Sequence, residues 1–252
     1  MNGDRRAGDV ALGVLGIGMF LLLWQIIGVY RLAGLTWPPL TEVIDTLTDP
    51  NRTGVFLRGA KATFSSAATG FALGTVLGLA VATGVHLAPP LRLGVDRLAS
   101  VVNALPGIAL GPILIVTLGP AAAPVALATI SVFFLTYVAA RAGLATAAQA
   151  NQDLFTVLGA RRARRLVRLE LPAALPTIAS GVRLSLGAAM IGAVLGEWFG
   201  APHGLGLIVI GAMQNFQIPL LWCAVLLIAA ASIMVYAAAT VLEAAAYRTF
   251  GE

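Results

Sequence analysis

Ionisable side chains are scarce in this chain, and one short segment gathers many of them. Four arginines follow one another at the spacing i, i+3, i+4 and i+7, namely Arg161, Arg164, Arg165 and Arg168. On a regular helix this spacing places all four on one face. Guanidinium groups on one face bind carboxylates or phosphates, so the segment predicts either a surface that docks into a partner or a helix that lies on anionic lipid. The spacing alone leaves both interpretations open.

Three further ionisable residues fall within or beside long apolar runs: His86, Arg183 and Glu197. Such groups at membrane depth can relay protons or coordinate ions, which keeps an ion-coupled secondary transporter or a channel as an alternative function. Each also fits a position at the membrane interface, where Arg183 would extend toward water. Glu197 is the strongest candidate for a pore, since it precedes Trp198 and a glycine-rich segment.

The sequence carries no motif for nucleotide hydrolysis. The pattern G-x-x-x-x-G-K-[ST] does not occur, and the single lysine, Lys61, lies in no glycine-rich nucleotide motif. The single cysteine, Cys223, excludes an internal disulfide and belongs to no metal-binding motif. We therefore expect no enzymatic site and no metal in this chain.

The elements that position these residues must lie in lipid. Of the 252 residues 59% are hydrophobic and only 11% are charged, against about 25% charged residues in soluble domains. The mean hydropathy is +0.91. The net charge of +5 comes mainly from arginines at the ends of apolar runs, so we expect no nucleic-acid binding. The composition predicts an all-α, polytopic membrane protein.

A bilayer core about 30 Å thick needs about 20 apolar residues per helix. We predict about six transmembrane helices within a single domain, 1–252, near residues 10–29, 62–88, 98–118, 120–140, 176–196 and 219–242. Arg5 and Arg6 before the first run also fit a signal peptide, but no A-x-A-like site follows, so a retained helix is favoured.

Glycine and proline add detail to two of these helices. Gly70, Gly74 and Gly78 recur at every fourth position of the second, which predicts a face for close helix packing. Pro106 and Pro112 interrupt the third, as is tolerated where a helix packs on protein or lines a cavity.

Most of the 16 Lys and Arg residues fall on one side of the predicted spans. The positive-inside rule then puts both termini and the loop 141–175 in the cytoplasm. Within that loop one continuous helix would place Arg165 between Leu154 and Leu158. A break at Gly159–Ala160 removes this conflict, because glycine commonly ends helices. Leu171-Pro172 is expected to end the second helix.

The loop resembles the "EAA" motif of binding-protein-dependent ABC transporter permeases, which is E-A-A, three residues, G, nine residues, I, one residue and L-P. Here Asp153 stands at the Glu position, Gly159 at the Gly, Leu169 at the Ile, and Leu171-Pro172 at the Leu-Pro. Leu154-Phe155 in place of Ala-Ala is a departure, but the spacing is complete.

Other segments resemble the nitrate/sulfonate/taurine branch of these permeases, over roughly residues 35–245. They are Trp37-Pro38-Pro39, Ala104-Leu105-Pro106, Leu158-Gly159-Ala160, Leu171–Pro176, Gly181-Val182-Arg183, Gly196-Glu197 and Gly204-Leu205-Gly206. The resemblance implies a MetI-like permease core with a cytoplasmic coupling helix, in the cytoplasmic (inner) membrane of a bacterium.

For mechanism, the resemblance implies that two permease chains, expected as a homodimer, form the pore. The loop helix would insert into a cleft on an ABC ATPase subunit, present in two copies, and an extracytoplasmic binding protein would deliver substrate. ATP and Mg would be bound by the ATPase, so this chain would need no cofactor. The coupling role carries over to Asp153, Leu158, Gly159, Ala160 and Arg161.

Four residues near the expected pore helices are candidates for the translocation path: Asn103, Pro106, Met190 and Glu197. By resemblance, nitrate, taurine or alkyl sulfonates are the leading substrates, and a thiamine-precursor pyrimidine or a riboflavin-like compound is the alternative. A structural membrane protein is a third class, but it would not account for the loop.

Overall fold

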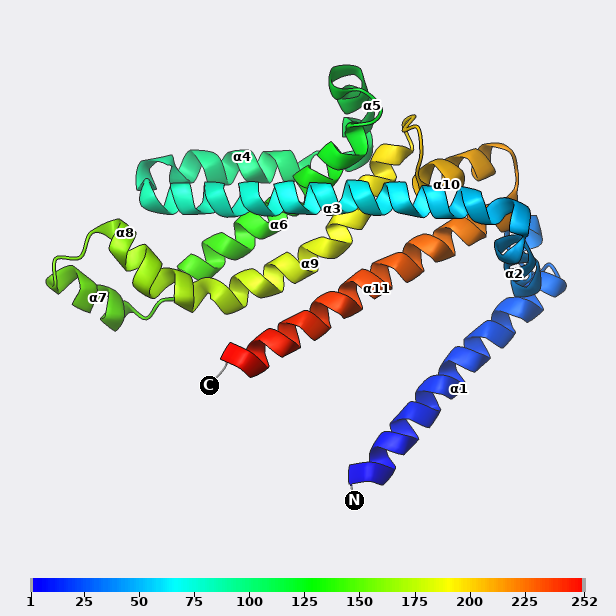
Figure 1. Ribbon diagram of the computed structural model, residues 1–252, viewed down its shortest axis with the longest axis horizontal. Coiled ribbons are helices and arrows are strands. Elements are labelled where there is room, and N and C mark those ends of the chain that lie inside the picture. Colours follow the sequence, from blue (N-terminus) through cyan, green and yellow to red (C-terminus); the bar gives the residue numbers. More distant parts are fainter. Residues whose placement is uncertain (1, 251–252) are drawn as a thin grey trace. The chain divides into compact units, whose positions relative to one another are not determined.

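The computed structural model describes residues 2–250, and the side chains of residue 8, residues 11–148 and residues 151–240. The side chains of Arg5 and Arg6 lie outside this part. Every regular element in the described chain is helical (Figure 1), which confirms the predicted all-α fold.

The helices follow in chain order. They are α1 (Asn2–Val29), η1 (Gly34–Thr36), α2 (Leu40–Thr48), α3 (Pro50–Leu87), η2 (Pro89–Leu91), α4 (Arg92–Ala104), α5 (Gly107–Leu118), α6 (Ala123–Leu144), α7 (Gln149–Val157), α8 (Arg162–Arg165), the π-helical turn η3 (Leu166–Glu170), α9 (Leu171–Glu197), α10 (Leu205–Gln214) and α11 (Ile218–Phe250).

The chain divides into two compact units. The first runs up to Leu57 and includes Ile208–Leu226, and the second consists of Arg58–Leu207 and the residues from Leu227 onward. The prediction of one permease domain over 1–252 stays a prediction.

Five helical segments in the described chain are long and apolar enough to cross a membrane: Ala11–Val29, Pro50–Leu87, Ala123–Leu144, Arg162–Glu197 and Ile218–Thr240. A sixth span would be the pair Pro89–Ala104 and Gly107–Leu118, which is bent by 97°. The interruption predicted at Pro106 within the span near 98–118 is therefore present, whereas Pro112 lies inside α5 without ending it. Leu105, the residue before Pro106, adopts the extended backbone (ψ 125°) that a following proline imposes, and the helix breaks there.

The helix end predicted at Leu171-Pro172 is wrong. α8, η3 and α9 form one helical segment of 36 residues, Arg162–Glu197. A proline inside a helix lacks an N–H and its ring crowds the carbonyl four residues earlier. The π-helical turn η3 lies just before Pro172. Its wider turn gives the proline ring the space that a regular α-helix would lack at this point. The predicted loop 141–175 is thus largely helical.

The core of the second unit forms around α6, which packs between α3 and α9. A Cβ on Gly74 of α3 would lie 2.7 Å from the Thr129 carbonyl oxygen, and one on Gly192 of α9 would lie 2.7 Å from the Ala128 Cα. The glycine face predicted on α3 is therefore a packing face, and α9 contributes a second one. The buried cluster along this seam contains Ala67, Ala128, Val132, Ala189, Met190, Ala193 and Ala231.

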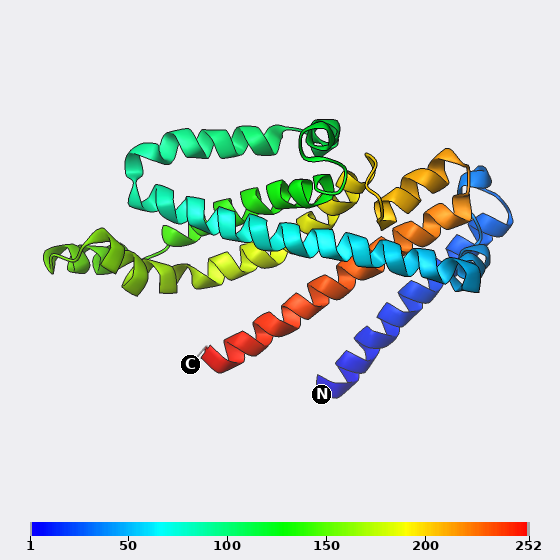
Figure 2. The same ribbon diagram turned by 45° about the horizontal axis from the view of Figure 1, so that its top comes forward.

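α3 and α4 form a helical hairpin joined by η2, as both ribbon views show (Figures 1 and 2). Ala82 of α3 and Ala99 of α4 belong to one buried cluster with Tyr137 and Ala140 of α6. The hairpin therefore brings the end of α3 and the start of α4 close to the end of α6.

Three tryptophans hold the first unit together. The rings of Trp24, Trp37 and Trp222 lie with centroids 4.7–4.9 Å apart. Trp24 Nε1 donates to the Pro38 carbonyl oxygen (3.1 Å), and Trp222 Nε1 donates to that of Thr36 (3.0 Å). These contacts fix the short segment between α1 and α2.

Candidate functional site

α7 ends in a turn that requires a left-handed residue. Gly159 has φ +66°, and its N–H donates to the Thr156 carbonyl oxygen (3.0 Å). The N–H of Ala160 donates to the Phe155 carbonyl oxygen (3.0 Å). These two bonds make a Schellman motif, which glycine favours because it has no Cβ to clash in this conformation. The helix break predicted at Gly159–Ala160 is present.

Large apolar side chains at this end of α7 are exposed. Leu154 is 54% exposed, Val157 84% and Leu158 71%. In both ribbon views α7 and α8 project beyond the neighbouring ends of α6 and α9 (Figures 1 and 2). An apolar group at the tip of a projecting hairpin is typical of a contact with another protein.

The five residues expected to couple to an ATPase occupy this one turn. Asp153 lies on α7, Leu158 caps it, Gly159 and Ala160 form the turn, and Arg161 caps α8 with an extended backbone (φ −63°, ψ 148°). Asp153, Leu158 and Arg161 are exposed. The structure brings the set together, while its coupling role stays a prediction.

The arginine stripe does not form as the spacing predicts. Arg161, Arg164 and Arg168 are exposed, but Arg165 turns inward and its Nε donates to Glu170 Oε1 at 2.9 Å. Arg161 is the N-cap of α8 and has an extended backbone, so a helical spacing counted from Arg161 does not give the faces of the residues that follow. The period changes again at η3, before Arg168. The single amphipathic face expected from the sequence is therefore corrected.

Glu170 is a site residue that the sequence reasoning missed. Its side chain is 2% exposed, and Oε2 lies 2.7 Å from Nε2 of His86, in the last turn of α3. With Arg165 on its other oxygen, Glu170 joins the α8–η3 segment to the end of α3. A buried carboxylate needs charged or hydrogen-bonding partners. The sequence feature that could have indicated this site is a single acidic residue directly after an arginine-rich segment.

Asp96 forms a second cluster that the sequence reasoning missed. Tyr137 of α6 donates its hydroxyl hydrogen bond to Asp96 of α4. Arg141 Nε lies 3.5 Å and Arg92 Nε 3.7 Å from the same carboxylate. These contacts hold the start of α4 against the end of α6.

Two of the four expected path residues are enclosed by protein. Met190 is 2% exposed within the core between α6 and α9, and Glu197 is 1% exposed. α6 and neighbouring elements cover both side chains, and their assignment to the path stays a prediction. Asn103 and Pro106 are exposed beside the bend between α4 and α5, and their assignment stays a prediction.

Glu197 is the centre of a buried hydrogen-bond network. Its Oε2 accepts bonds from Thr63 Oγ1 (3.0 Å) and the Gly206 N–H (2.8 Å). The Leu205 N–H donates in turn to Thr63 Oγ1 at 2.9 Å. Gly204 has φ +149°, and a Cβ there would overlap the Glu197 carboxylate. The glycine-rich segment therefore folds around this carboxylate and closes the end of α9.

Arg183 lies well inside α9, since the helical segment begins at Arg162 and not near Pro176. Its guanidinium carbon lies 5.7 Å from the centre of the Tyr236 ring, a cation–π distance. The expected position of Arg183 at the membrane interface stays a prediction.

The sequence profile of the "Binding-protein-dependent transport system inner membrane component" family matches residues 74–247, more than half of the chain. A probable ABC transporter permease protein of Haemophilus influenzae is 28% identical, over 88% of this chain and 91% of its own length.

The names of two further relatives include a substrate. The formylaminopyrimidine transport permease protein ThiX of Halalkalibacterium halodurans is 28% identical over 89% of this chain and 90% of its own. The putative aliphatic sulfonates transport permease protein SsuC of Bacillus subtilis is 27% identical over 81% and 75%. Among solved structures, a chain of the MetNI methionine ABC transporter in inward-facing conformation superposes with TM-score 0.67, at 18% identity, over 79% of this chain and 99% of its own.

Proposed function

The chain belongs to the family of binding-protein-dependent transport system inner membrane components, and from this premise we propose that two copies of it form the pore of an ABC importer. Each copy is a multi-pass membrane subunit. Family membership implies an ATPase and a substrate-binding protein as the partners of such a subunit. We place it in the cytoplasmic membrane of a bacterium with both termini in the cytoplasm, as the distribution of arginines favours.

The observation that carries the proposal is the exposed apolar end of α7 at the Gly159 turn. Val157 and Leu158 are more than two-thirds exposed although both are apolar. A groove on the ATPase would cover these two side chains. Removing their apolar surface from water would stabilise the contact between the two subunits. Asp153 and Arg161 flank this apolar contact with charges of opposite sign, which favours one orientation in the groove.

A rigid connection runs from this turn into the membrane. α8, η3 and α9 form one helical segment of 36 residues that begins directly after the turn. Glu170 ties the same segment to His86 on α3. A displacement of the turn when the ATPase closes would therefore move α9 and the end of α3 together, which is how ATP hydrolysed on a partner would open and close the pore.

For substrate we propose a small nutrient delivered by the binding protein. The relatives point to two classes, an organic sulfonate such as taurine and a formylated aminopyrimidine, and nitrate and riboflavin-like compounds belong to the wider set. Glu197, the one charged residue among the four candidates for the path, is enclosed by protein, which leaves few charged side chains to select a substrate within the membrane. We assign selection to the binding protein, whose bound ligand would identify the substrate class.

An ion-coupled transporter is the alternative from another class. It needs an intramembrane ionisable group that can change partners. Glu197 is held by Thr63 and Gly206, and His86 by Glu170, all at hydrogen-bonding distances. These fixed contacts favour structural roles for both residues.

Reconstitution of the chain with its ATPase and binding protein in proteoliposomes tests the proposal. We expect no ATP hydrolysis by the chain alone, co-purification with the ATPase, and uptake that stops when the ATPase is inactivated by substitution of its phosphate-loop lysine. Uptake that continues with the inactive ATPase but collapses on addition of an ionophore would establish the ion-coupled alternative instead.

A further inference from the structure

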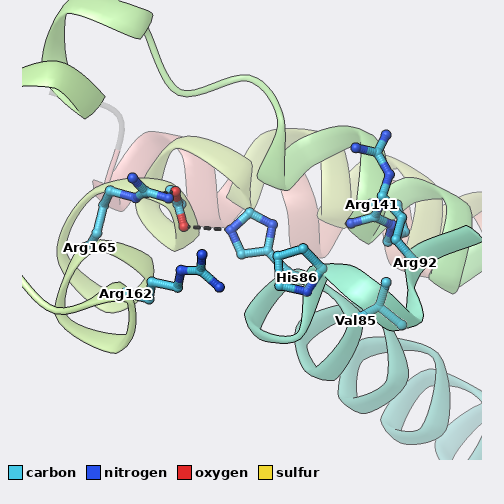
Figure 3. A pocket seen from close by; sticks show the side chains of 8 residues that line it. Val85, His86, Arg92, Arg141, Arg162 and Arg165 are labelled. Atoms are coloured by element: carbon cyan, nitrogen blue, oxygen red, sulfur yellow. Dashed lines mark hydrogen bonds and ion pairs between the residues drawn. The ribbon is translucent and has the colours of Figure 1, made fainter. Parts of the chain in front are cut away.

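A cavity of about 220 Å³ lies where four helices of the second unit meet (Figure 3). Val85 and His86 come from the end of α3, and Pro89 from η2. The remaining lining residues are Arg92 of α4, Arg141 of α6, Arg162 and Arg165 of α8, and Glu170 of η3. Figure 3 shows Arg162 and Arg165 on one side of His86 and Arg92 and Arg141 on the other.

Positive charge exceeds negative charge around this cavity. Four guanidinium groups line it against one carboxylate, Glu170, whose two oxygens are already engaged by Arg165 and His86. Asp96 is the partner of both Arg92 and Arg141. Arg162 forms no ion pair with any residue that the structure describes.

The arginines retain donors that can bind a further acceptor. Each guanidinium carries five N–H groups, and Arg165, Arg141 and Arg92 approach their carboxylates through Nε. The Arg141 side chain is only 15% exposed, so water satisfies its remaining donors poorly. Converging guanidinium groups with spare donors suit the oxygens of a phosphate, which accepts paired N–H bonds.

The cavity lies at the ends of membrane-spanning helices. α3 ends at Leu87, α6 ends at Leu144, and the segment Arg162–Glu197 begins with a residue that lines the cavity. α6 has 22 residues, about the length that crosses the apolar layer, so its end near Arg141 lies at the depth of lipid headgroups. Basic pockets between the cytoplasmic ends of such helices bind anionic headgroups.

We propose that this cavity binds a phosphate group, supplied by the headgroup of an anionic phospholipid. Arg162 and Arg165 hold it from the α8 side, and Arg92 and Arg141 hold it from α4 and α6. Dissolved phosphate has the same chemistry but lacks the acyl chains that would lie along the neighbouring apolar helices. Bound lipid would link the segment after the Gly159 turn to the ends of α3, α4 and α6.

The test uses the full chain, purified in a neutral detergent and stripped of lipid, with native mass spectrometry as the readout. The probes are dioleoyl phosphatidylglycerol, dioleoylglycerol as the same chains without phosphate, and inorganic phosphate as a competitor. The variants are Arg162→Gln and Arg92→Gln. Arg164→Gln is the matched control, because Arg164 is exposed in α8 and does not line the cavity.

We expect saturable binding of phosphatidylglycerol but not of dioleoylglycerol. Each cavity variant should weaken it by about tenfold, the loss expected for one hydrogen bond between charged groups, with no change in Arg164→Gln. If millimolar inorganic phosphate displaces phosphatidylglycerol, the cavity binds phosphate from solution, and the assignment to a lipid headgroup is wrong. Equal binding of the two lipids, or equal loss in all three variants, would overturn the proposal. Arg162→Gln removes no ion pair, so its folding should be intact, and a thermal unfolding scan checks this.

Discussion

Glu197 and Thr63 lie 134 residues apart in the chain, yet their side chains form a buried hydrogen bond of 3.0 Å between the end of α9 and α3. Both side chains are essentially inaccessible to solvent, at 1% and 0% exposure. Glu197 Oε2 also accepts from the Gly206 N–H. These hydrogen bonds link the end of α9 to α3 and to Gly206, and the assignment of Glu197 to the translocation path stays a prediction.

The first prediction concerns this hydrogen bond between Thr63 and Glu197. Thr63→Val leaves the Leu205 N–H without an acceptor and removes the hydrogen bond from Thr63 to Glu197 Oε2. The unsatisfied buried groups should lower the free energy of unfolding by about 1–3 kcal/mol. A lower apparent Tm of the purified chain would report it. Thr69→Val is the control, because the Thr69 hydroxyl bonds only to its own helix, at the Ser65 carbonyl oxygen, and is exposed. An equal loss in both variants would contradict the role of the network.

The second prediction concerns the turn after α7. Gly159→Val forces a β-branched residue into the left-handed region at about 1–2 kcal/mol, although a Cβ there meets no atom within 4 Å. We expect normal membrane insertion but weaker ATPase co-purification and loss of ATP-driven uptake. Gly159→Asn should retain most uptake, since asparagine tolerates this conformation. Full uptake by the valine variant would count against the docking turn.

The third prediction concerns the seam between α3 and α6. Gly74→Ala places a Cβ 2.7 Å from the Thr129 carbonyl oxygen and from Val132, so the helices must separate, at a cost of about 1–3 kcal/mol for overpacking. Gly84→Ala on the same helix meets nothing within 4 Å and should leave the Tm unchanged or raise it. Thermal unfolding in detergent compares the two, and a stable Gly74→Ala variant would refute close packing there.

The fourth prediction concerns orientation in the membrane. Arg164→Cys in a Cys223→Ala background places one thiol on the exposed surface of α8. A membrane-impermeant maleimide should label it in inverted vesicles and leave it unlabelled in intact spheroplasts, because the arginine-rich segment should face the cytoplasm. Labelling in the spheroplasts alone would reverse the proposed topology.

Local patterns determined much of the architecture. Apolar runs predicted membrane helices because lipid requires every backbone group to bond within its own helix. Glycine at every fourth position predicted the packing face of α3, and the spacing around Gly159 predicted the break. These features depend on neighbours within a few residues, so the sequence carries them directly.

The effect of each proline on its helix was harder to predict, because it depends on how the neighbouring turns compensate. Pro106 and Pro172 offer the same local signal, yet the chain bends by 97° next to Pro106 and continues as a helix through Pro172. The difference is the π-helical turn before Pro172, which relieves the crowding and includes the buried Glu170. No local pattern reveals that the partners of Glu170 include a histidine 84 residues away.

The sequence by itself determined that the chain is a helical membrane protein with a glycine turn in an arginine-rich segment, since hydrophobicity and backbone preference act locally. Only the tertiary structure decided what its few charges do. It buried Glu197 against Thr63, turned Arg165 and His86 onto Glu170, and gathered four arginines around one cavity. A charge in a low-dielectric interior takes its role from the partners that neutralise it, and folding brings those partners from distant parts of the chain.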